Sequence, residues 1–149
     1  QVAGGLELGR INIAARGAGM AKGATNMALQ YAMDRKTFGK AIAEHQAIQL
    51  KLAEMSTRAA AAELLVHQAA DKFDRHERCD LEAGQAKFFA SEAAVQNSLN
   101  AMRVFGGYSY SPEYEIERFY RDAPLLCIGE GTNEIQRMII AKQMVARAT

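Results

Sequence analysis

Three clusters of polar residues and glycines have the composition of sites that do chemistry. They span residues 34–39, 103–107 and 130–134. Each combines glycine, which lets a ligand or another backbone approach closely, with side chains that form hydrogen bonds. Gly131 beside Thr132 at a helix start also fits an anion site. Helix caps and turns use the same residue types, so spacing alone leaves both interpretations open.

The histidines do not fit the metal site that helical bundles often hold. A di-iron centre needs Glu-x-x-His pairs that project inward. None of His45, His67 and His76 has a glutamate three residues before it. The sequence also lacks the Gly-x-Gly-x-x-Gly and phosphate-loop patterns. We therefore expect no metal and no self-contained nucleotide-binding turn, and we expect the histidines on solvated helix faces or ends.

Helical periodicity determines where the clusters lie. Apolar or small residues alternate at spacings of four and three in two segments: Ile13, Gly17, Met20, Ala24, Met27 and Tyr31, and then Ile48, Leu52, Met55, Ala59, Ala62, Val66, Ala69 and Phe73. This pattern predicts two helices, the second roughly 30 residues long. Residues 34–44 interrupt the pattern at Phe38-Gly39 and predict a loop.

Further helices are predicted by their boundary residues. Asp80 is well placed to cap a third helix from Leu81 to about Phe105, which Gly106-Gly107 ends.

Beyond that point, Pro112 is expected to open a short helix near residues 114–120. Thr132 can cap a last helix that runs to about Ala146, and Glu134 suits the positive end of its dipole. Four principal helices with short connections predict an all-α, antiparallel (up-down) four-helix bundle with a short additional helix, spanning residues 1–149 as one domain.

Composition agrees with closely packed helices and excludes several classes of function. Hydrophobic residues, many of them alanine, make up 49% of the chain, with two prolines and no tryptophan. Because 18 basic and 17 acidic residues are scattered along it, we expect no nucleic-acid partner. No apolar stretch is long enough to span a membrane. Two lone cysteines, Cys79 and Cys127, favour a reducing, intracellular compartment: the cytoplasm, or the mitochondrial matrix in a eukaryote.

Four motifs in register resemble the C-terminal helical domain of the acyl-CoA dehydrogenases over essentially the whole chain. They are Arg35-Lys36-Thr37-Phe38-Gly39-Lys40 with Gln46 downstream, Phe105-Gly106-Gly107-Tyr108, Glu117-Arg118 followed by Arg121-Asp122-Ala123, and Glu130-Gly131-Thr132-Asn133-Glu134-Ile135-Gln136-Arg137. The resemblance implies that the protein is an FAD-dependent enzyme, which converts an acyl-CoA to a trans-2-enoyl-CoA in fatty acid β-oxidation. An electron-transfer flavoprotein is the expected electron acceptor, and the expected assembly is a dimer or homotetramer.

Glu130 stands at the family's catalytic base position, where it would take the α-proton while flavin N5 takes the β-hydride. The thioester carbonyl, which accepts hydrogen bonds from the flavin ribityl hydroxyl and the backbone N–H of the base residue, would stabilise the enolate. Some members carry the base one residue before an arginine of the first helix. That position is Gly9 here, before Arg10, which supports Glu130.

The resemblance also implies contacts to FAD and substrate. Arg35 would contact the FAD pyrophosphate across a dimer interface. The other expected FAD contacts are Thr37, Phe38, Gln46, Arg103, Gly106, Gly107, Thr132 and Glu134, and the expected substrate contacts are Glu7, Arg10 and Gly131. Many members have glutamine where this chain has Arg103, so Arg103 is expected either at the adenine end or as an added phosphate contact. A solvated salt bridge is an equal interpretation for Arg10.

Two further hypotheses remain alongside the dehydrogenase. An acyl-CoA oxidase would share the architecture, and the oxygen reactivity of the reduced flavin would distinguish it. A non-catalytic oligomerisation module would be expected to lose the base. The chain begins Gln1-Val2 without an initiator methionine, so we expect a fragment that lacks the family's N-terminal helical and middle β-barrel domains and is inactive when isolated.

Overall fold

The computed structural model describes residues 2–148, with side chains from residue 5 onward. Its elements in chain order are α1 (Val2–Asp34), β1 (Lys36–Thr37), β2 (Lys40–Ala41), the 3₁₀ helix η1 (Ile42–Glu44), α2 (Gln46–Asp74), α3 (Asp80–Phe105), the 3₁₀ helix η2 (Gly106–Tyr110), α4 (Ile116–Ile128) and α5 (Asn133–Ala148). The two strands pair antiparallel, with Lys36 opposite Ala41 and Thr37 opposite Lys40.

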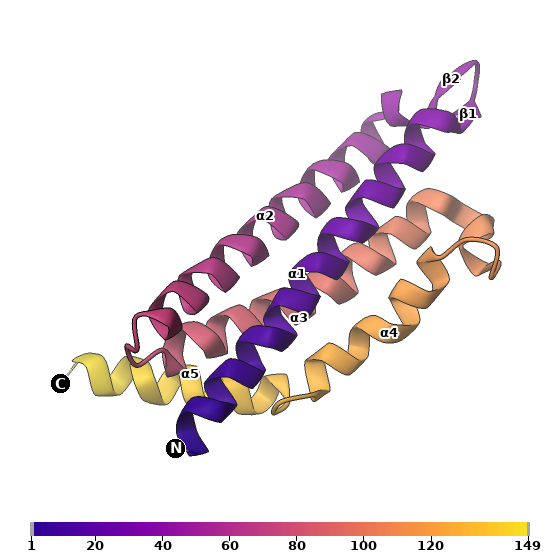
Figure 1. Cartoon of the computed structure of the whole chain (residues 1–149). Helices are drawn as coiled ribbons and strands as arrows, with labels where there is room; N and C mark the ends of the chain where they lie inside the picture. Colours follow the sequence, from indigo (N-terminus) through magenta and orange to yellow (C-terminus); the bar gives the residue numbers. More distant parts are fainter. Residues whose placement is uncertain (1, 149) are drawn as a thin grey trace.

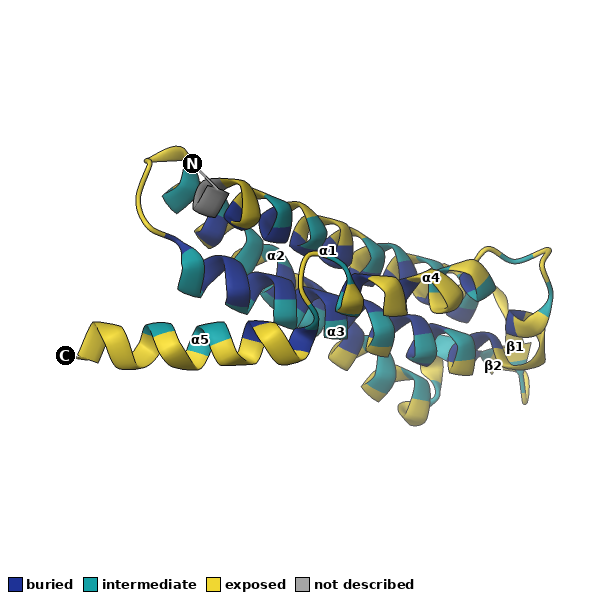
Figure 2. Cartoon of the chain, turned by 90° about the horizontal axis from the view of Figure 1, so that it is seen from below, coloured by how far each residue is buried: buried dark blue, intermediate teal, exposed yellow. Residues whose placement is uncertain are grey.

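Helices α1 to α4 form the bundle, and α5 crosses one end of it against α3 (Figure 1). The core consists largely of alanines, and α1 and α3 approach so closely that a Cβ atom at Gly17 would lie 2.7 Å from the carbonyl oxygen of Ala90. Such close packing makes α3 the most buried helix, whereas α5 exposes most of its surface (Figure 2). The predicted fold class is confirmed. The small residues of the periodic faces permit this close packing.

The fourth member of the bundle differs from the one predicted. Helix α4 takes this place and α5 lies outside it, because α4 continues through Pro124 to Ile128 and buries Ile116, Ala123 and Leu126 against α3 and α1. Pro112 does not open this helix: it lies in a turn, and α4 begins at Ile116.

The start of α3 also differs in detail from the prediction. Cys79 occupies the N-cap position without a side-chain cap, and Asp80 is the first helical residue. Its carboxylate lies 3.0 Å from the Arg78 guanidinium. An acidic residue in the first turn still complements the helix dipole, so the sequence signal was correct and its position was off by one residue.

Glu82 connects α5 to the bundle. This buried carboxylate in the first turn of α3 accepts hydrogen bonds from Arg147 Nη1 and Nη2 at 2.7 and 2.9 Å, and from Lys72 Nζ at 2.6 Å. The bonds from Arg147, together with that from Lys72, lower the pKa of Glu82 to about 2. Arg147 of α5 and Lys72 of α2 therefore share one buried carboxylate of α3. None of the helices within residues 2–148 has the length and apolarity that crossing a bilayer requires.

Candidate active site

Glu130 lies in the α4–α5 loop, residues 129–132, in an uncommon backbone conformation. Its φ is +56°, and that of Gly131 is +88°. The left-handed region costs a non-glycine residue roughly 1–2 kcal/mol and persists where surrounding contacts enforce it. Gln136, which is fully buried, donates from Nε2 to the carbonyl oxygens of both Glu130 and Gly131 at 3.1 Å. The two hydrogen bonds from the buried Gln136 therefore fix the conformation of this loop.

The Glu130 side chain lies against α1 at Gly9. A Cβ atom at Gly9 would lie 2.6 Å from Glu130 Oε2 and 2.9 Å from Cδ. Only a residue without a side chain leaves room for the carboxylate in this place. The structure thus brings together the predicted base and the position where some family members carry theirs. Glu130 itself is exposed in this chain.

Arg10, the next residue of α1, is buried, and its Nε has no hydrogen-bond partner among the described residues. A buried guanidinium N–H without an acceptor is costly, so this atom suits a ligand acceptor. Glu7 is different. It is two residues before Gly9, and therefore about 200° around the helix from the face that meets Glu130.

Glu7 contacts the start of α3. Burial raises its pKa, and the neighbouring Asp80 raises it further, while hydrogen bonds from Cys79 lower it. These contacts favour a role in attaching α1 to α3, and they provide no support for the predicted contact between Glu7 and substrate.

A second group of predicted residues gathers at the opposite end of α1. Arg35, Thr37, Gly106 and Gly107 line one cavity of about 400 Å³, together with Tyr31, Ile42, Val104, Phe105 and Tyr108. The Arg35 guanidinium lies 5.8 Å from the centre of the Tyr108 ring, and no carboxylate of residues 5–148 forms an ion pair with it. A free cation in a concave site is what an anionic ligand requires.

Glycine gives this cavity its open wall. Gly106 has φ +63° and ψ −140°, a combination that side chains disfavour, and it ends α3. A Cβ atom at Gly106 or Gly107 would meet no other atom within 4 Å. Packing within the described chain therefore does not require glycine at position 107, whereas close approach by a ligand would.

The β1–β2 hairpin presents Phe38 to solvent. Phe38 and Gly39 form its two-residue loop, both with positive φ, as a type I′ turn requires. The Phe38 side chain is 97% exposed. Its ring packs edge-on against His45, whose Nε2 lies 2.9 Å from Thr37 Oγ1. The ring is therefore open to contact with another molecule.

The remaining predicted cofactor residues divide between the two ends. Gln46 is exposed at the start of α2 beside the hairpin, and Arg103 is exposed near the end of α3, 3.4 Å from Asn100 Oδ1. Thr132 and Glu134 lie instead at the Glu130 end. Thr132 directly precedes α5, as predicted, and its carbonyl oxygen accepts from the Gln136 N–H. Hydrogen bonds from its own backbone N–H and from Thr132 lower the pKa of Glu134.

Within one chain the two groups are far apart. From residue 9 to residue 34 the helix α1 rises about 38 Å at 1.5 Å per residue. We call the groups the base end (Gly9, Arg10 and the α4–α5 loop) and the hairpin end (Arg35, Thr37, Phe38, Gly106 and Gly107). Figure 1 shows the start of α1 beside the α4–α5 connection and the hairpin at the far end.

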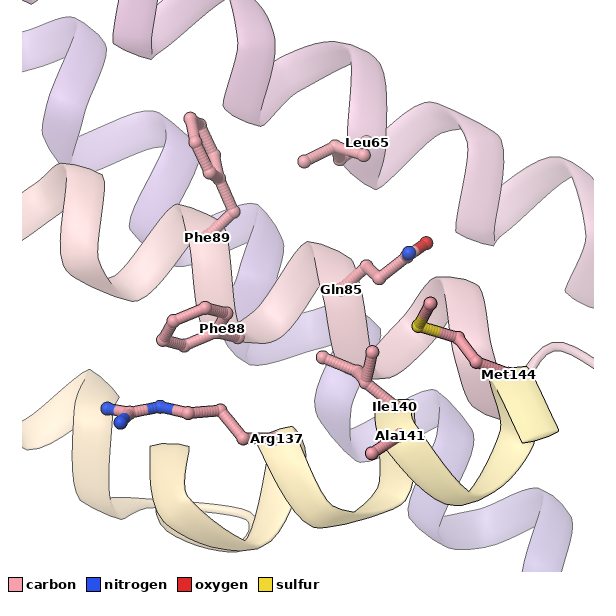
Figure 3. A pocket seen from close by; sticks show the side chains of 8 residues that line it. All are labelled: Leu65, Gln85, Phe88, Phe89, Arg137, Ile140, Ala141 and Met144. Atoms are coloured by element: carbon pink, nitrogen blue, oxygen red, sulfur yellow. The ribbon is translucent and has the colours of Figure 1, made fainter.

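An apolar groove lies apart from both ends. Phe88 and Phe89 of α3, Leu65 of α2 and Met144 of α5 project into a cavity of about 460 Å³ (Figure 3). Gln85, Arg137, Ile140 and Ala141 complete its lining. It contains none of the predicted site residues.

Comparison with known proteins identifies the class. The family described as "Acyl-CoA dehydrogenase, C-terminal domain" matches residues 1–145, and the chain belongs to that family. An acyl-CoA dehydrogenase of Bacillus subtilis is 50% identical over 140 residues, which are 94% of this chain and 37% of the relative.

Two other proteins show the range of relatives. The caffeyl-CoA reductase-Etf complex subunit CarC of Acetobacterium woodii is 42% identical over 142 residues, which are 95% of this chain and 38% of that protein. The structure of butyryl-CoA dehydrogenase from Megasphaera elsdenii superposes with a TM-score of 0.92 and 39% identity, over 94% of this chain and 37% of that one. The chain thus spans little more than a third of the relatives that it matches.

Proposed function

We propose that the complete protein is an acyl-CoA dehydrogenase in which Glu130 removes the α-proton of an acyl-CoA thioester and the product is a trans-2-enoyl-CoA. The observation that carries this proposal is the position of the Glu130 carboxylate against Gly9 of α1. Glu130 itself lies on a loop and has a left-handed backbone conformation. A base must be placed within hydrogen-bond reach of the proton that it removes, and this loop restricts where the carboxylate can lie.

The substrate itself takes up the electron pair that the removed proton leaves behind. The Cα–H bond breaks, a Glu130 carboxylate oxygen takes the proton, and the electron pair delocalises onto the thioester carbonyl. The backbone N–H of Glu130 would donate to that carbonyl oxygen, and Gly131 would let the thioester approach. The unpartnered Arg10 Nε offers a further donor for substrate at this end.

The residues of the hairpin end fit FAD, which when bound would supply the acceptor for the β-hydride at flavin N5. Arg35 would pair with the pyrophosphate, and Thr37, Phe38, Gln46, Arg103, Gly106 and Gly107 would surround that part of the cofactor. Thr132 and Glu134 would contact FAD at the base end.

The distance between the two ends supports a composite site. The short ribityl chain of one FAD molecule cannot bridge about 38 Å between the Glu130 and Arg35 groups of one chain. We therefore propose that the hairpin end contacts the FAD whose flavin lies at the base end of a second copy. This arrangement requires at least a dimer, and a homotetramer would contain two such pairs.

Further properties of the whole protein follow from the same proposal. We propose fatty acid β-oxidation as the process, an intracellular location, and an electron-transfer flavoprotein as electron acceptor. The name of the Acetobacterium woodii relative, a subunit of a reductase-Etf complex, supports the last of these.

Glu130→Gln in the complete, FAD-loaded protein tests the proposal. The change keeps the size and hydrogen bonding of the side chain but removes the proton acceptor. Turnover should fall by about 10² to 10⁴, while acyl-CoA still binds and perturbs the flavin spectrum without bleaching it. Glu63→Gln, at a half-buried surface glutamate paired with Lys22, is the matched control and should keep full activity. Near-normal turnover of Glu130→Gln would refute the assignment.

A second candidate is the reverse reaction, reduction of a 2-enoyl-CoA, which the name of the caffeyl-CoA reductase relative favours. Glu130 would then return the proton to Cα. Comparing the rate of acyl-CoA formation from an enoyl-CoA and reduced electron-transfer flavoprotein with the rate of the forward reaction shows which direction the protein favours. An oxidase would instead reduce oxygen rapidly after flavin bleaching.

A further inference from the structure

Lys87 is a fully buried lysine that the proposed reaction does not use. It lies on α3, and its Nζ donates to the Cys127 carbonyl oxygen at 3.0 Å and to Asn133 Oδ1 at 2.8 Å. Burial lowers the pKa of Lys87, while the nearby Glu92 and Glu134 oppose that shift. A buried amine needs hydrogen-bond acceptors in place of water. These two bonds therefore hold the Cys127 carbonyl and the Asn133 side chain close to Lys87.

The two acceptors flank the loop that carries Glu130. Cys127 belongs to the last turn of α4, and Asn133 is the first residue of α5. One buried amine therefore joins the two ends of the α4–α5 loop and connects both to α3.

Asn133 is held in turn by α3. Its Nδ2 donates to Glu92 Oε1 at 2.8 Å and to Ser91 Oγ at 3.0 Å. Asn133, Ser91 and Lys87 are all buried, so water competes little for these bonds. The loop between the two acceptors contains the left-handed Glu130, a conformation that surrounding contacts must enforce.

We propose that Lys87 is a positioning residue for Glu130: its bonds to Cys127 and Asn133 hold the α4–α5 loop in the conformation that keeps the Glu130 carboxylate against Gly9. This proposal rests on the proposed role of Glu130 as the base. It assigns to Lys87 no contact with substrate or cofactor.

The test is Lys87→Met in the complete, FAD-loaded protein, because methionine keeps an unbranched apolar stem and removes the donor. We expect kcat to fall by about 10- to 100-fold, since a displacement of about 1 Å can cost this much. KM and the flavin spectrum with bound acyl-CoA should change by less than about twofold. The isotope effect with substrate deuterated at Cα should rise, because proton removal then limits turnover more strongly.

Asn97→Leu is the matched control for a purely structural role. Asn97 is also fully buried on α3, and its Nδ2 donates to the carbonyl oxygens of Met55 and Ala21 at 2.8 and 3.2 Å, away from the loop. This variant should lower the melting temperature without changing kcat or the isotope effect. If Lys87→Met yields no folded holoprotein, Asn133→Ala removes the opposite partner and should give the same loss of kcat and the same rise in isotope effect.

Two results would overturn the proposal. One is a lowered melting temperature in Lys87→Met, or in Asn133→Ala where it replaces that variant, with kcat and isotope effect unchanged. The other is an equal loss of kcat in Asn97→Leu. Failure of the proposed function looks different: Glu130→Gln would then remain active, whereas an inactive Glu130→Gln beside a normal Lys87→Met refutes only the role of Lys87.

Discussion

Adding one methyl group at Gly9 should impair the base without unfolding the bundle. In Gly9→Ala the new Cβ atom would lie 2.6 Å from Glu130 Oε2, whereas ordinary contacts begin near 3.4 Å, so the carboxylate must move by about 0.8 Å. Glu130 is exposed and its carboxylate is the far end of a flexible side chain, so the movement should cost little stability. A displacement of this size can reduce turnover by up to about 10², with little effect on KM.

Steady-state kinetics and thermal unfolding of the complete enzyme check this prediction. Gly19→Ala is the matched control, because Gly19 lies on the same helix and a Cβ atom there would meet nothing within 4 Å. Both changes should raise helix stability by roughly 0.5–1 kcal/mol, but only Gly9→Ala should lose activity. Full turnover in Gly9→Ala would show that the Glu130 carboxylate is not held at Gly9 during the reaction.

Four other variants and the isolated chain provide further tests. Glu130→Gln with Gly9→Glu should regain little activity, since the amide still occupies the space beside residue 9. Glu130→Gly with Gly9→Glu should instead restore a measurable fraction of turnover. If this second variant is folded but inactive, a carboxylate at residue 9 does not reach the place of the Glu130 carboxylate. Arg35→Ala should weaken the binding free energy of FAD by about 1.5 to 3 kcal/mol, measured as loss of FAD during dialysis. Unchanged retention of FAD would make Arg35 structural. The isolated 149 residues should fold, as circular dichroism would show, but should show no dehydrogenase turnover, and stoichiometric FAD with turnover would contradict this. In that chain the folded-state pKa of Glu82 lies below its ordinary 4.5, so its contribution is complete above pH 4.5 and is lost as the pH falls toward about 2. Urea unfolding at pH 7 should show Glu82→Gln less stable by about 2 to 3 kcal/mol, with the difference shrinking below pH 4.5; a constant difference would contradict the assignment.

The helices could be predicted from the sequence because their signal is local. The repeat from Ile48 to Phe73 predicted a helix that the structure extends only from Gln46 to Asp74. Boundaries were less reliable where two signals compete. Pro112 is a good helix opener and also a good turn residue, and the tertiary contacts of Ile116 decide in favour of a turn.

The conformation of the candidate base could not be predicted in the same way. Nothing local to Glu130 requires a left-handed backbone in a non-glycine residue. The contacts around the loop come from Gln136, one turn into the next helix, and from Lys87 on α3. Neither was named as a candidate, although a charged Lys87 among Ala83, Ala90 and Ala94 on one face of α3 was the available signal.

The sequence by itself determined the helices, their order, and the three junctions where glycine meets polar side chains, because period and composition act over a few residues. Only the tertiary structure decided which junctions meet. Arg35 and Thr37 share a cavity with Gly106 and Gly107, while the α4–α5 loop lies with Gly9 at the other end of α1. The reason is physical: a long helix separates its two ends by its rigid length, and close alanine packing determines which neighbouring ends come into contact.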